Sequence, residues 1–492
     1  MNAEECNGRE PQGTRKKPHR QKQNPIETAI SSWYRKYVVR LKSLHDVSDL
    51  IAQAPKRWTA YGPLVLLPAG SFTSPAWRDA IDLTADSSVL GPTDDDNKNT
   101  TKGNENARGP ALLWKTILDE ISGSATAKLT HLAINEGIPL HSKESSEVTA
   151  GRTGNGESEN ILRSPSGLRM LYGDFGPSTL STPTSNSKEG LPQPGKVTQE
   201  DFSGAFWVST KQNGITQTWA PRWTMFSRGN IKEKARLLAF HDAVTPSNSA
   251  NQQNSPALSH RHIPVTQRAG AVAVDLYAGI GYFAFCYAAL GFRVLCWELN
   301  AWSVEGLRRG AEANRWSVRV VRPAAQSSGE EEEEMLRDVL AGDETIVVFL
   351  EDNARAAGRI RRLDELTRER EARGENSGDK GKNNAGIRMS DIMHVNCGLL
   401  PTSRGSWGAA WDIAASAPRA WFHIHENVGV SDIDAEKEEI REWFAARART
   451  LGDAGDVCAE HVELVKTFAP GVWHCVFDLY VRRTADRAGG IT

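Results

Sequence analysis

The chain has 492 residues, and its 59 basic and 61 acidic side chains give a formal net charge of −2. This length accommodates two or three domains, and contact with a nucleic acid would have to use local basic patches. The six scattered cysteines form no C-x-x-C pair, which argues against a disulfide framework and a zinc ribbon. The apolar runs are too short for a membrane span and the polar N-terminus is no signal peptide, so we expect a cytoplasmic protein without a metal.

The first 199 residues alternate between polar stretches and stretches with a folded pattern. Residues 1–25 are polar and basic and are predicted to be a disordered tail. Residues 26–199 are predicted to be a small α/β domain, in which Trp33, Tyr37 and Leu41 mark one side of an amphipathic helix with a basic face. Further folded pieces are expected at 62–69, 111–121, 128–139 and 160–175, with flexible insertions at 92–110, 141–159 and 177–199.

Residues 212–238 lead from an aromatic stretch into a helix. Ser227 is a candidate N-cap, and Lys232 to Leu238 follow as the helix. Basic side chains near a helix N-terminus, Lys234 among them, can receive a carboxylate or a phosphate. A connecting helix with a solvated basic face explains the same pattern equally well.

The rest of the chain is organised around residues 271–314, which predict a strand, a glycine turn, a helix, a second strand and a further helix. Gly279 and Gly281 remove the side chains that would keep a ligand away from the backbone at the first strand end. Glu298 follows the second strand, where a carboxylate can accept both hydroxyls of a ribose. The pattern therefore predicts a site for an adenosine-type cofactor.

The glycine turn also fits the G-x-G-x-x-A fingerprint of dinucleotide-binding proteins. Asp275 argues against a nicotinamide or flavin cofactor, because a carboxylate at this position would repel a pyrophosphate. The same carboxylate can accept the α-amino group of a methionine moiety. S-adenosylmethionine is therefore the expected cofactor.

Three later strands complete the predicted site. The strand at 345–350 ends at Asp352 and Asn353, which suit recognition of adenine but also suit a helix cap. The strand at 392–395 ends at Asn396, before a Gly/Pro loop where the transferred group is expected to meet the substrate. The strand at 420–424 carries His423 and is followed by His425, Glu426 and Asn427. We expect His423 and His425 on opposite faces and in a polar rim, without a metal.

The helix at 434–450 and the hairpin of 460–468 with 472–483 close the pattern. Five strands with helical crossovers and a closing antiparallel hairpin predict an α/β fold over residues 200–492. We expect the seven-stranded, Rossmann-like sheet of the class I S-adenosylmethionine-dependent methyltransferases.

Several motifs together resemble the tRNA wybutosine-synthesizing protein 2 (TYW2) family. These are MFSRGNIKEKARLL, VDLYAGIGYFAF, CWELNAWSVEGLRRGAEAN, VNCGLLP and WFHIHENV. The resemblance is strong over about residues 200–492 and weaker over 26–176. The family is related to the tRNA guanine-N1 methyltransferases, but the loop after Asn396 lacks the Asn-Pro-Pro form that is typical of amino-group methylation.

The resemblance implies transfer of the α-amino-α-carboxypropyl group from S-adenosylmethionine to C7 of 4-demethylwyosine, beside the anticodon of tRNA(Phe), with release of methylthioadenosine. By the same resemblance, Ser227 and Lys234 match cofactor contacts and Glu298 matches the ribose acid. Asp352 and Asn353 match the adenine-side pair. The physical argument adds Asp275, Gly279, Gly281 and, as a positioning residue, Asn396.

The sequence identifies the residues that contact the RNA less clearly than those of the cofactor site. Trp219, Trp223, Arg222 and the basic helix over residues 33–42 are candidates for holding the anticodon loop, although the tryptophans can equally belong to the core. A tRNA guanine-N1 methyltransferase and a non-catalytic tRNA-binding protein are the alternatives. The presence of Gly279, Gly281 and Glu298 argues against a non-catalytic protein, which would not need to keep a cofactor site.

Overall fold

The structure is a computed structural model. It describes residues 23–38, 46–85, 108–123, 128–135, 141–142, 158–159, 167–177, 197–242, 259–268, 270–323, 328–374, 386–450 and 456–483. Residues 1–22 of the predicted tail over residues 1–25, and most of the predicted insertions, lie outside these residues. No helix within the described ranges is long and apolar enough to cross a membrane.

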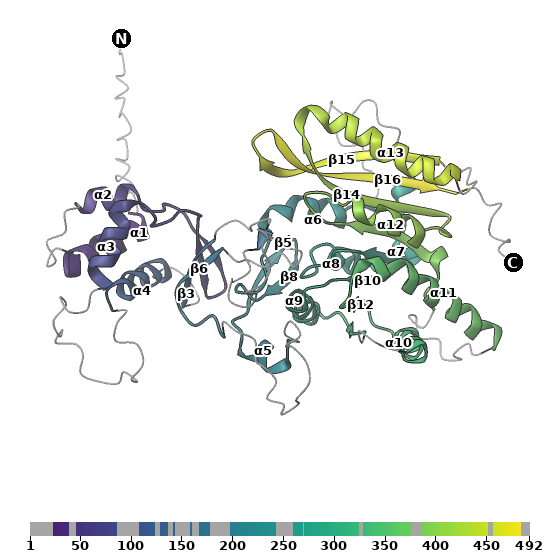
Figure 1. Cartoon of the computed structure of the whole chain (residues 1–492), viewed down its shortest axis with the longest axis horizontal. Coiled ribbons are helices and arrows are strands. Elements are labelled where there is room, and N and C mark those ends of the chain that lie inside the picture. The colour runs from purple at the N-terminus through teal and green to yellow at the C-terminus, as the bar shows by residue number, and fades with distance from the viewer. Residues whose placement is uncertain are drawn as a thin grey trace, which may run out of the picture. The chain divides into compact units, whose positions relative to one another are not determined.

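The described chain divides into two compact units (Figure 1). One unit holds the described residues up to Asn135 together with Arg169–Gly173, and the other holds the described residues of Glu136–Leu168 and those from Asp174 onward. The domain boundaries expected from the sequence, after residues 25 and 199, stay predictions.

The first unit is a four-stranded sheet covered by helices. Its strands lie in the order β1 (Thr59–Tyr61), β2 (Leu64–Leu67), β3 (His131–Asn135) and β6 (Leu168–Tyr172). The helices are α1 (Pro25–Trp33), α2 (Val47–Ala52), α3 (Pro75–Ala85) and α4 (Arg108–Ser122), with the π-helical turn η1 (Tyr34–Val38) after α1.

The first helix begins earlier than its aromatic spacing predicts. The side chain of Asn24 accepts a hydrogen bond from the amide of Ile26, and proline occupies the first turn, so the helix begins at Pro25. Trp33 is 1% exposed and packs in the core of the unit. This aromatic side therefore faces the interior, as expected of a packed amphipathic helix, and contact of its basic face with RNA stays a prediction.

The second unit contains an eight-stranded sheet in the order β11-β12-β10-β9-β13-β14-β16-β15. The bounds are β9 (Val272–Asp275), β10 (Arg293–Trp297), β11 (Val318–Val321), β12 (Ile346–Phe349), β13 (Ile392–Cys397), β14 (Arg419–Gly429), β15 (Asp456–Ala469) and β16 (Val472–Arg482). Strand β16 runs opposite to the other seven strands of this sheet and pairs antiparallel with β14 and β15. The predicted Rossmann-like plan is confirmed, and β11 adds one strand at the edge, beside β12.

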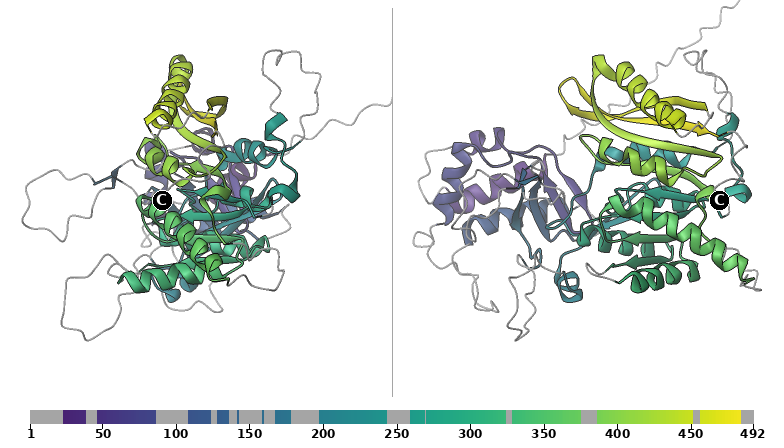
Figure 2. Two further views of the ribbon diagram at one scale, coloured as in Figure 1. Left: turned by 90° about the vertical axis from the view of Figure 1, so that its right-hand side faces the viewer. Right: turned by 45° about the vertical axis from the view of Figure 1, so that its right-hand side comes forward.

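Helices cover both faces of this sheet (Figures 1 and 2). One face packs against α10 (Gly329–Ala341), α11 (Ala356–Ala372), α12 (Trp407–Ile413) and α13 (Ile433–Thr450). The other packs against α6 (Ile231–Leu238), α8 (Ala284–Ala289) and α9 (Ala301–Ala313). A hairpin of β7 (Val208–Gln212) and β8 (Ile215–Trp219) contacts α9. The unit also contains the short helices α5 (Gln199–Gly204) and α7 (Val265–Arg268) and a two-stranded sheet of β4 (His141–Ser142) and β5 (Ser158–Glu159).

The fifth predicted strand is longer than its sequence pattern indicates. Strand β14 continues to Gly429 because it pairs with β16 along its whole length. His425, Glu426 and Asn427 are therefore inside the sheet and not in a following loop.

Candidate active site

The carboxyl ends of β12, β10, β9 and β13 lie side by side, because these four parallel strands are neighbours in the sheet. Asp275 on β9 is the register partner of Cys296 on β10 and of Asn396 on β13. The strand order thus brings together the predicted residues Asp275, Glu298 and Asn396. Ligands of open α/β sheets bind at this edge.

The glycine turn has the backbone that its sequence predicts. Gly279 and Gly281 have φ angles of 54° and 86°, which L side chains rarely adopt. A Cβ atom on Gly281 would lie 2.6 Å from the ring of Phe285. Glu298 closes the turn, because one carboxylate oxygen accepts the amide of Gly279 at 2.9 Å and the other accepts that of Asn300 at 2.8 Å.

Asp275 is fully buried and holds one side of the site. Its Oδ1 accepts the side-chain amide of Asn396 at 3.0 Å and the backbone amide of Tyr277 at 3.2 Å. Its Oδ2 makes no close hydrogen bond with the described residues, although the backbone amide of Ala284 also lowers the pKa of this carboxyl. Burial raises the pKa of Asp275 to about 6. A buried oxygen that lacks a donor suits a cationic ligand group.

The third strand end combines a structural cap with a link between strands. Asp352 Oδ1 accepts the amide of Ala354 at 2.8 Å and caps the short helix η6 (Asn353–Arg355). Asn353 donates its side-chain amide to the carbonyl of Leu276 at 2.9 Å. The cap interpretation of Asp352 is therefore correct, and Asn353 ties the end of β12 to the end of β9.

Ser227 is linked to the glycine turn through Tyr282. Its amide donates to the Tyr282 hydroxyl at 3.0 Å, and the Tyr282 ring lies 3.0 Å from a Cβ built on Gly279. The Ser227 hydroxyl lies 3.3 Å from Asn230 Oδ1 and makes no bond to the helix backbone, so its predicted capping bond does not form. Its other partner is Lys466 on β15, with Nζ at 2.9 Å. Lys466 is 239 residues away from Ser227 in the chain, and no local pattern predicted this contact.

Lys234, the one cation among the predicted cofactor-binding residues, is buried. Its ammonium group donates to the side-chain oxygens of Gln212 and Gln217, each at 2.6 Å. Burial lowers the pKa of Lys234 to about 8. The nearby Arg236 pairs with Glu233 and Asp478.

Two of the aromatic candidates for RNA contact have partners within the protein. Trp219 is 2% exposed and stacks on Phe226, with ring centroids 4.6 Å apart, so its assignment as a stacking surface was wrong. Trp223 is half-buried and stacks on Trp302 at 4.9 Å. Their core packing is the interpretation that the structure supports.

The two histidines of β14 also require a correction. Residues i and i+2 of a strand share a face, and His423 and His425 are both buried on the side that carries His394 and Asn396. The two side chains therefore do not point to opposite faces of the sheet, and they do not lie in a polar rim. Among the described residues, no group of three or more His, Cys, Asp or Glu side chains could hold a metal ion.

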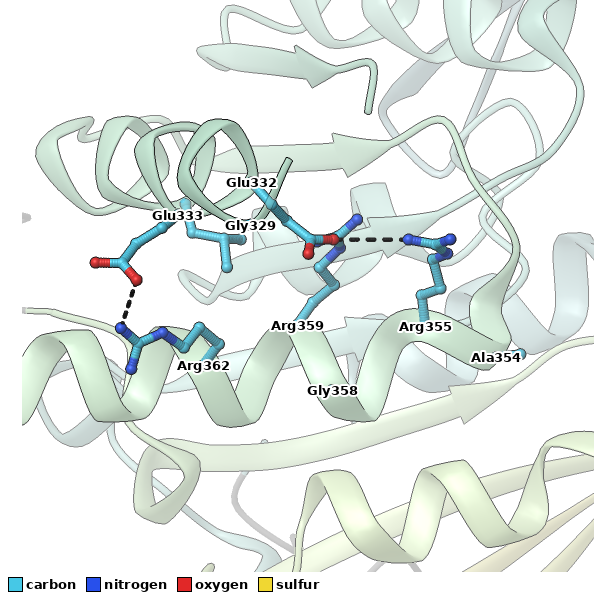
Figure 3. A pocket seen from close by; sticks show the side chains of 9 residues that line it. Gly329, Glu332, Glu333, Ala354, Arg355, Gly358, Arg359 and Arg362 are labelled. Atoms are coloured by element: carbon cyan, nitrogen blue, oxygen red, sulfur yellow. Dashed lines mark hydrogen bonds and ion pairs between the residues drawn. The ribbon is translucent and has the colours of Figure 1, made fainter. Parts of the chain in front are cut away.

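A pocket of about 390 Å³ lies between α10 and α11, and Ala354 and Arg355 of η6, just after the end of β12, also line it (Figure 3). Its arginines already face glutamates. Arg359 pairs with Glu332, and Arg362 pairs with Glu333 at 2.7 Å. None of the predicted site residues lines this pocket, which belongs to the solvated acidic face of α10.

The strand order, the glycine turn and the carboxylates at three neighbouring strand ends define a transferase that depends on S-adenosylmethionine. No protein-family model matches the chain. The tRNA wybutosine-synthesizing protein 2 of Schizosaccharomyces pombe is 31% identical over 463 residues, which cover 92% of this chain and 81% of that protein. The protein of the same name from Saccharomyces cerevisiae is 29% identical over 451 residues, covering 88% and 76%. The chain belongs to the tRNA wybutosine-synthesizing protein 2 family.

Solved structures with a similar arrangement are more distant in sequence. Pyrococcus horikoshii TYW2 in complex with MeSAdo has a TM-score of 0.47 at 14% identity, covering 93% of this chain and all of that chain. The M. jannaschii tRNA m1G37 methyltransferase has a TM-score of 0.39 at 12% identity, covering 94% and 80%.

Proposed function

We propose that the protein transfers the α-amino-α-carboxypropyl group of S-adenosylmethionine to C7 of 4-demethylwyosine in tRNA(Phe), and releases methylthioadenosine. The observation that carries this proposal is the identity of 31% with the Schizosaccharomyces pombe protein over most of both chains. The base lies beside the anticodon, so the partner is the anticodon loop.

The described residues fit the cofactor. The unpartnered Oδ2 of Asp275 accepts the α-amino group, and Glu298 accepts the ribose hydroxyls. Gly279 and Gly281 let the backbone approach the nucleoside. Asp352 and Asn353 face adenine, and Ser227 and Lys234 complete the set from the resemblance.

A sulfonium activates all three of its attached carbons, so the protein decides which of them reacts. It does so by positioning, since near-attack geometry alone accounts for a large share of such rate enhancements. Asp275 and Asn396 hold the amino-acid arm at the strand end where the RNA base enters. No nucleophilic side chain is required, because the electron-rich base is the nucleophile.

We place the reaction in the cytoplasm. Five of the six cysteines lie in the described ranges, and all five are free thiols. Free thiols are typical of a reducing compartment.

Two batches of S-adenosylmethionine test the reaction, one labelled on the methyl carbon and one on the aminobutyrate carbons. Each is incubated with the protein and with tRNA(Phe) that carries 4-demethylwyosine. Label in the RNA from the aminobutyrate batch alone, together with methylthioadenosine, is the expected result. Label from the methyl batch alone would make the protein a tRNA methyltransferase. Binding of cofactor and tRNA without any transfer would favour a non-catalytic tRNA-binding protein.

A further inference from the structure

The side chain of Asn396 is joined to two buried histidines on neighbouring strands. Asn396 Oδ1 lies 3.2 Å from His425 Nε2, and His425 Nδ1 lies 3.0 Å from His474 Nε2. Each of these side chains is 1% exposed. Together with the bond from Asn396 to Asp275, they form a row across β9, β13, β14 and β16. We call this row the Asp275 relay.

The chemistry of its members fixes the direction of every hydrogen bond in the relay. An ionised carboxylate can only accept, so Asn396 must present its Nδ2 to Asp275 and its Oδ1 to His425. His425 then carries its hydrogen on Nε2 and accepts at Nδ1. His474 must donate from Nε2, which leaves its Nδ1 as an acceptor. That atom has no partner among the described residues.

The lowered pKa values of His425 and His474 indicate that each imidazole carries a single N–H hydrogen. Burial, followed by the charge of His474, holds the pKa of His425 well below its usual range. Burial and the charge of Lys466 lower the pKa of His474 to about 3. Both rings are therefore neutral at pH 7, and a neutral imidazole offers one donor and one acceptor.

The surroundings leave the Asn396 amide little room. A Cβ on Gly398 would lie 2.9 Å from Asn396 Nδ2, and the ring of Phe283 lies 5.0 Å from that of His425, centroid to centroid. If the amide turned over, its oxygen would face Asp275 Oδ1 and its NH2 would face the donor nitrogen of His425. Both contacts would be repulsive, so His425 selects one orientation.

We infer that His425 and His474 are positioning residues. They hold the Asn396 amide toward Oδ1 of Asp275, and thereby keep Oδ2 of Asp275 available for the α-amino group of S-adenosylmethionine. The inference rests on the proposed function only for the identity of the ligand. Neither histidine is expected to touch the reacting atoms.

Calorimetry with S-adenosylmethionine tests the role of His425 through two substitutions. His425→Leu removes the donor and should weaken binding about tenfold, the effect of about 1.4 kcal/mol that is typical of a buried polar group left without a partner. In His425→Gln the side-chain NH2 can replace Nε2, so binding should stay within about threefold of the wild type. Equal losses in the two variants would overturn the inference.

A double-substitution cycle with Asp275→Asn separates positioning from simple packing. If His425 acts through Asp275, His425→Leu should change binding less than about twofold when Asp275 is already replaced. A full additional tenfold loss in the double variant would show that His425 acts independently of Asp275, and would contradict the relay.

The full-length wild-type protein provides a third test, in which the hydrogen positions are read from the unaltered chain and the variants serve only to assign the signals. Nitrogen-15 spectra of its imidazoles should place the hydrogen on Nε2 in both His425 and His474, assigned with His425→Gln and His474→Gln. A hydrogen on Nδ1 of either ring would overturn the inference. Calorimetry and spectra report on the cofactor site alone, so a negative label-transfer assay would refute the proposed reaction without affecting the relay.

Discussion

The side-chain amide of Asn396 donates to Asp275 Oδ1 at 3.0 Å, and the two residues are register partners on adjacent parallel strands. A residue of β13 and a residue of β9, 121 positions apart, thus share one hydrogen bond because the strand order places them together. Whereas the glycine turn and Glu298 lie in the segments that follow the strands, this pair is consequently held by the sheet itself. Rigid elements of this kind hold a reacting group more precisely than loops do.

Replacing Asp275 by asparagine should weaken S-adenosylmethionine binding about 10- to 100-fold. The substitution keeps the acceptor for Asn396 but removes the charge that faces the α-amino group, and bonds to charged groups contribute about 1.5–3 kcal/mol. Calorimetry measures the loss. Asp338→Asn, on the exposed surface of α10, is the matched control and should bind as the wild type does. Equal affinity of the two variants would contradict the role of Asp275.

Cofactor binding should weaken as the pH falls below 6. Burial raises the pKa of Asp275 to about 6, and only the ionised carboxylate attracts the α-amino group. The competent fraction is nearly complete at pH 8 and falls about tenfold per pH unit below 6, so the apparent dissociation constant rises by the same factor. Titrations at several pH values check this expectation. In Asp275→Asn this contribution should vanish, and a pH profile identical to that of the wild type would contradict the assignment.

Gly281→Ala should destabilise the protein more than Gly214→Ala. Both glycines have a positive φ, 86° and 80°, so each substitution costs about 1–3 kcal/mol of backbone strain. A Cβ on Gly281 also meets the Phe285 ring, whereas no described atom lies within 4 Å of a Cβ on Gly214. Overpacking adds about 1–3 kcal/mol. Unfolding by urea measures the difference, and equal losses would show that Phe285 moves aside without cost.

Local patterns predicted the parts of the site that are contiguous in sequence. The glycine turn, Glu298 and the strand ends at Asp275 and Asn396 could be identified because strand, turn and helix follow one another within a few residues. Contacts made across the sheet could not be predicted. Lys466 beside Ser227, and His474 beside His425, depend on how β15 and β16 pair, and a single sequence does not specify that register.

Burial was the other property that the sequence did not determine. Lys234 has the same local pattern whether its ammonium group faces a ligand or the two glutamines of the β7–β8 hairpin.

Strand β11 was not predicted from the sequence, because four strand residues between polar segments resemble a loop.

Asp478→Asn should cost about 3–5 kcal/mol of unfolding free energy, the loss that is typical of breaking a buried ion pair. Asp478 is fully buried, and its carboxylate contacts Arg236 at 2.5 Å, Arg261 at 3.3 Å and His423 at 2.8 Å. Asp456→Asn is the control, because its partner Arg482 and its own side chain are 65% and 72% exposed, and exposed pairs contribute little. Denaturant unfolding of both variants distinguishes them. A small loss for Asp478→Asn would mean that water reaches the cluster.

Lys234 and Lys466 are both candidates for binding the carboxylate of the amino-acid arm of S-adenosylmethionine. Lys234→Ala should weaken S-adenosylmethionine binding strongly and lower the melting temperature, because Gln212 and Gln217 lose their donor. Lys466→Met should weaken binding with little change in melting temperature, because Lys466 is only half-buried and contacts the hydroxyl of Ser227.

Lys232→Met is the control for both lysines, since this side chain is 65% exposed and pairs with Glu463. Calorimetry and thermal unfolding of the three variants separate binding from stability. Wild-type affinity in Lys234→Ala would assign that lysine to the core and leave Lys466 as the carboxylate-binding cation. Wild-type affinity in Lys466→Met would instead assign the carboxylate to Lys234, because the loss of Lys466 would then have no effect on cofactor binding.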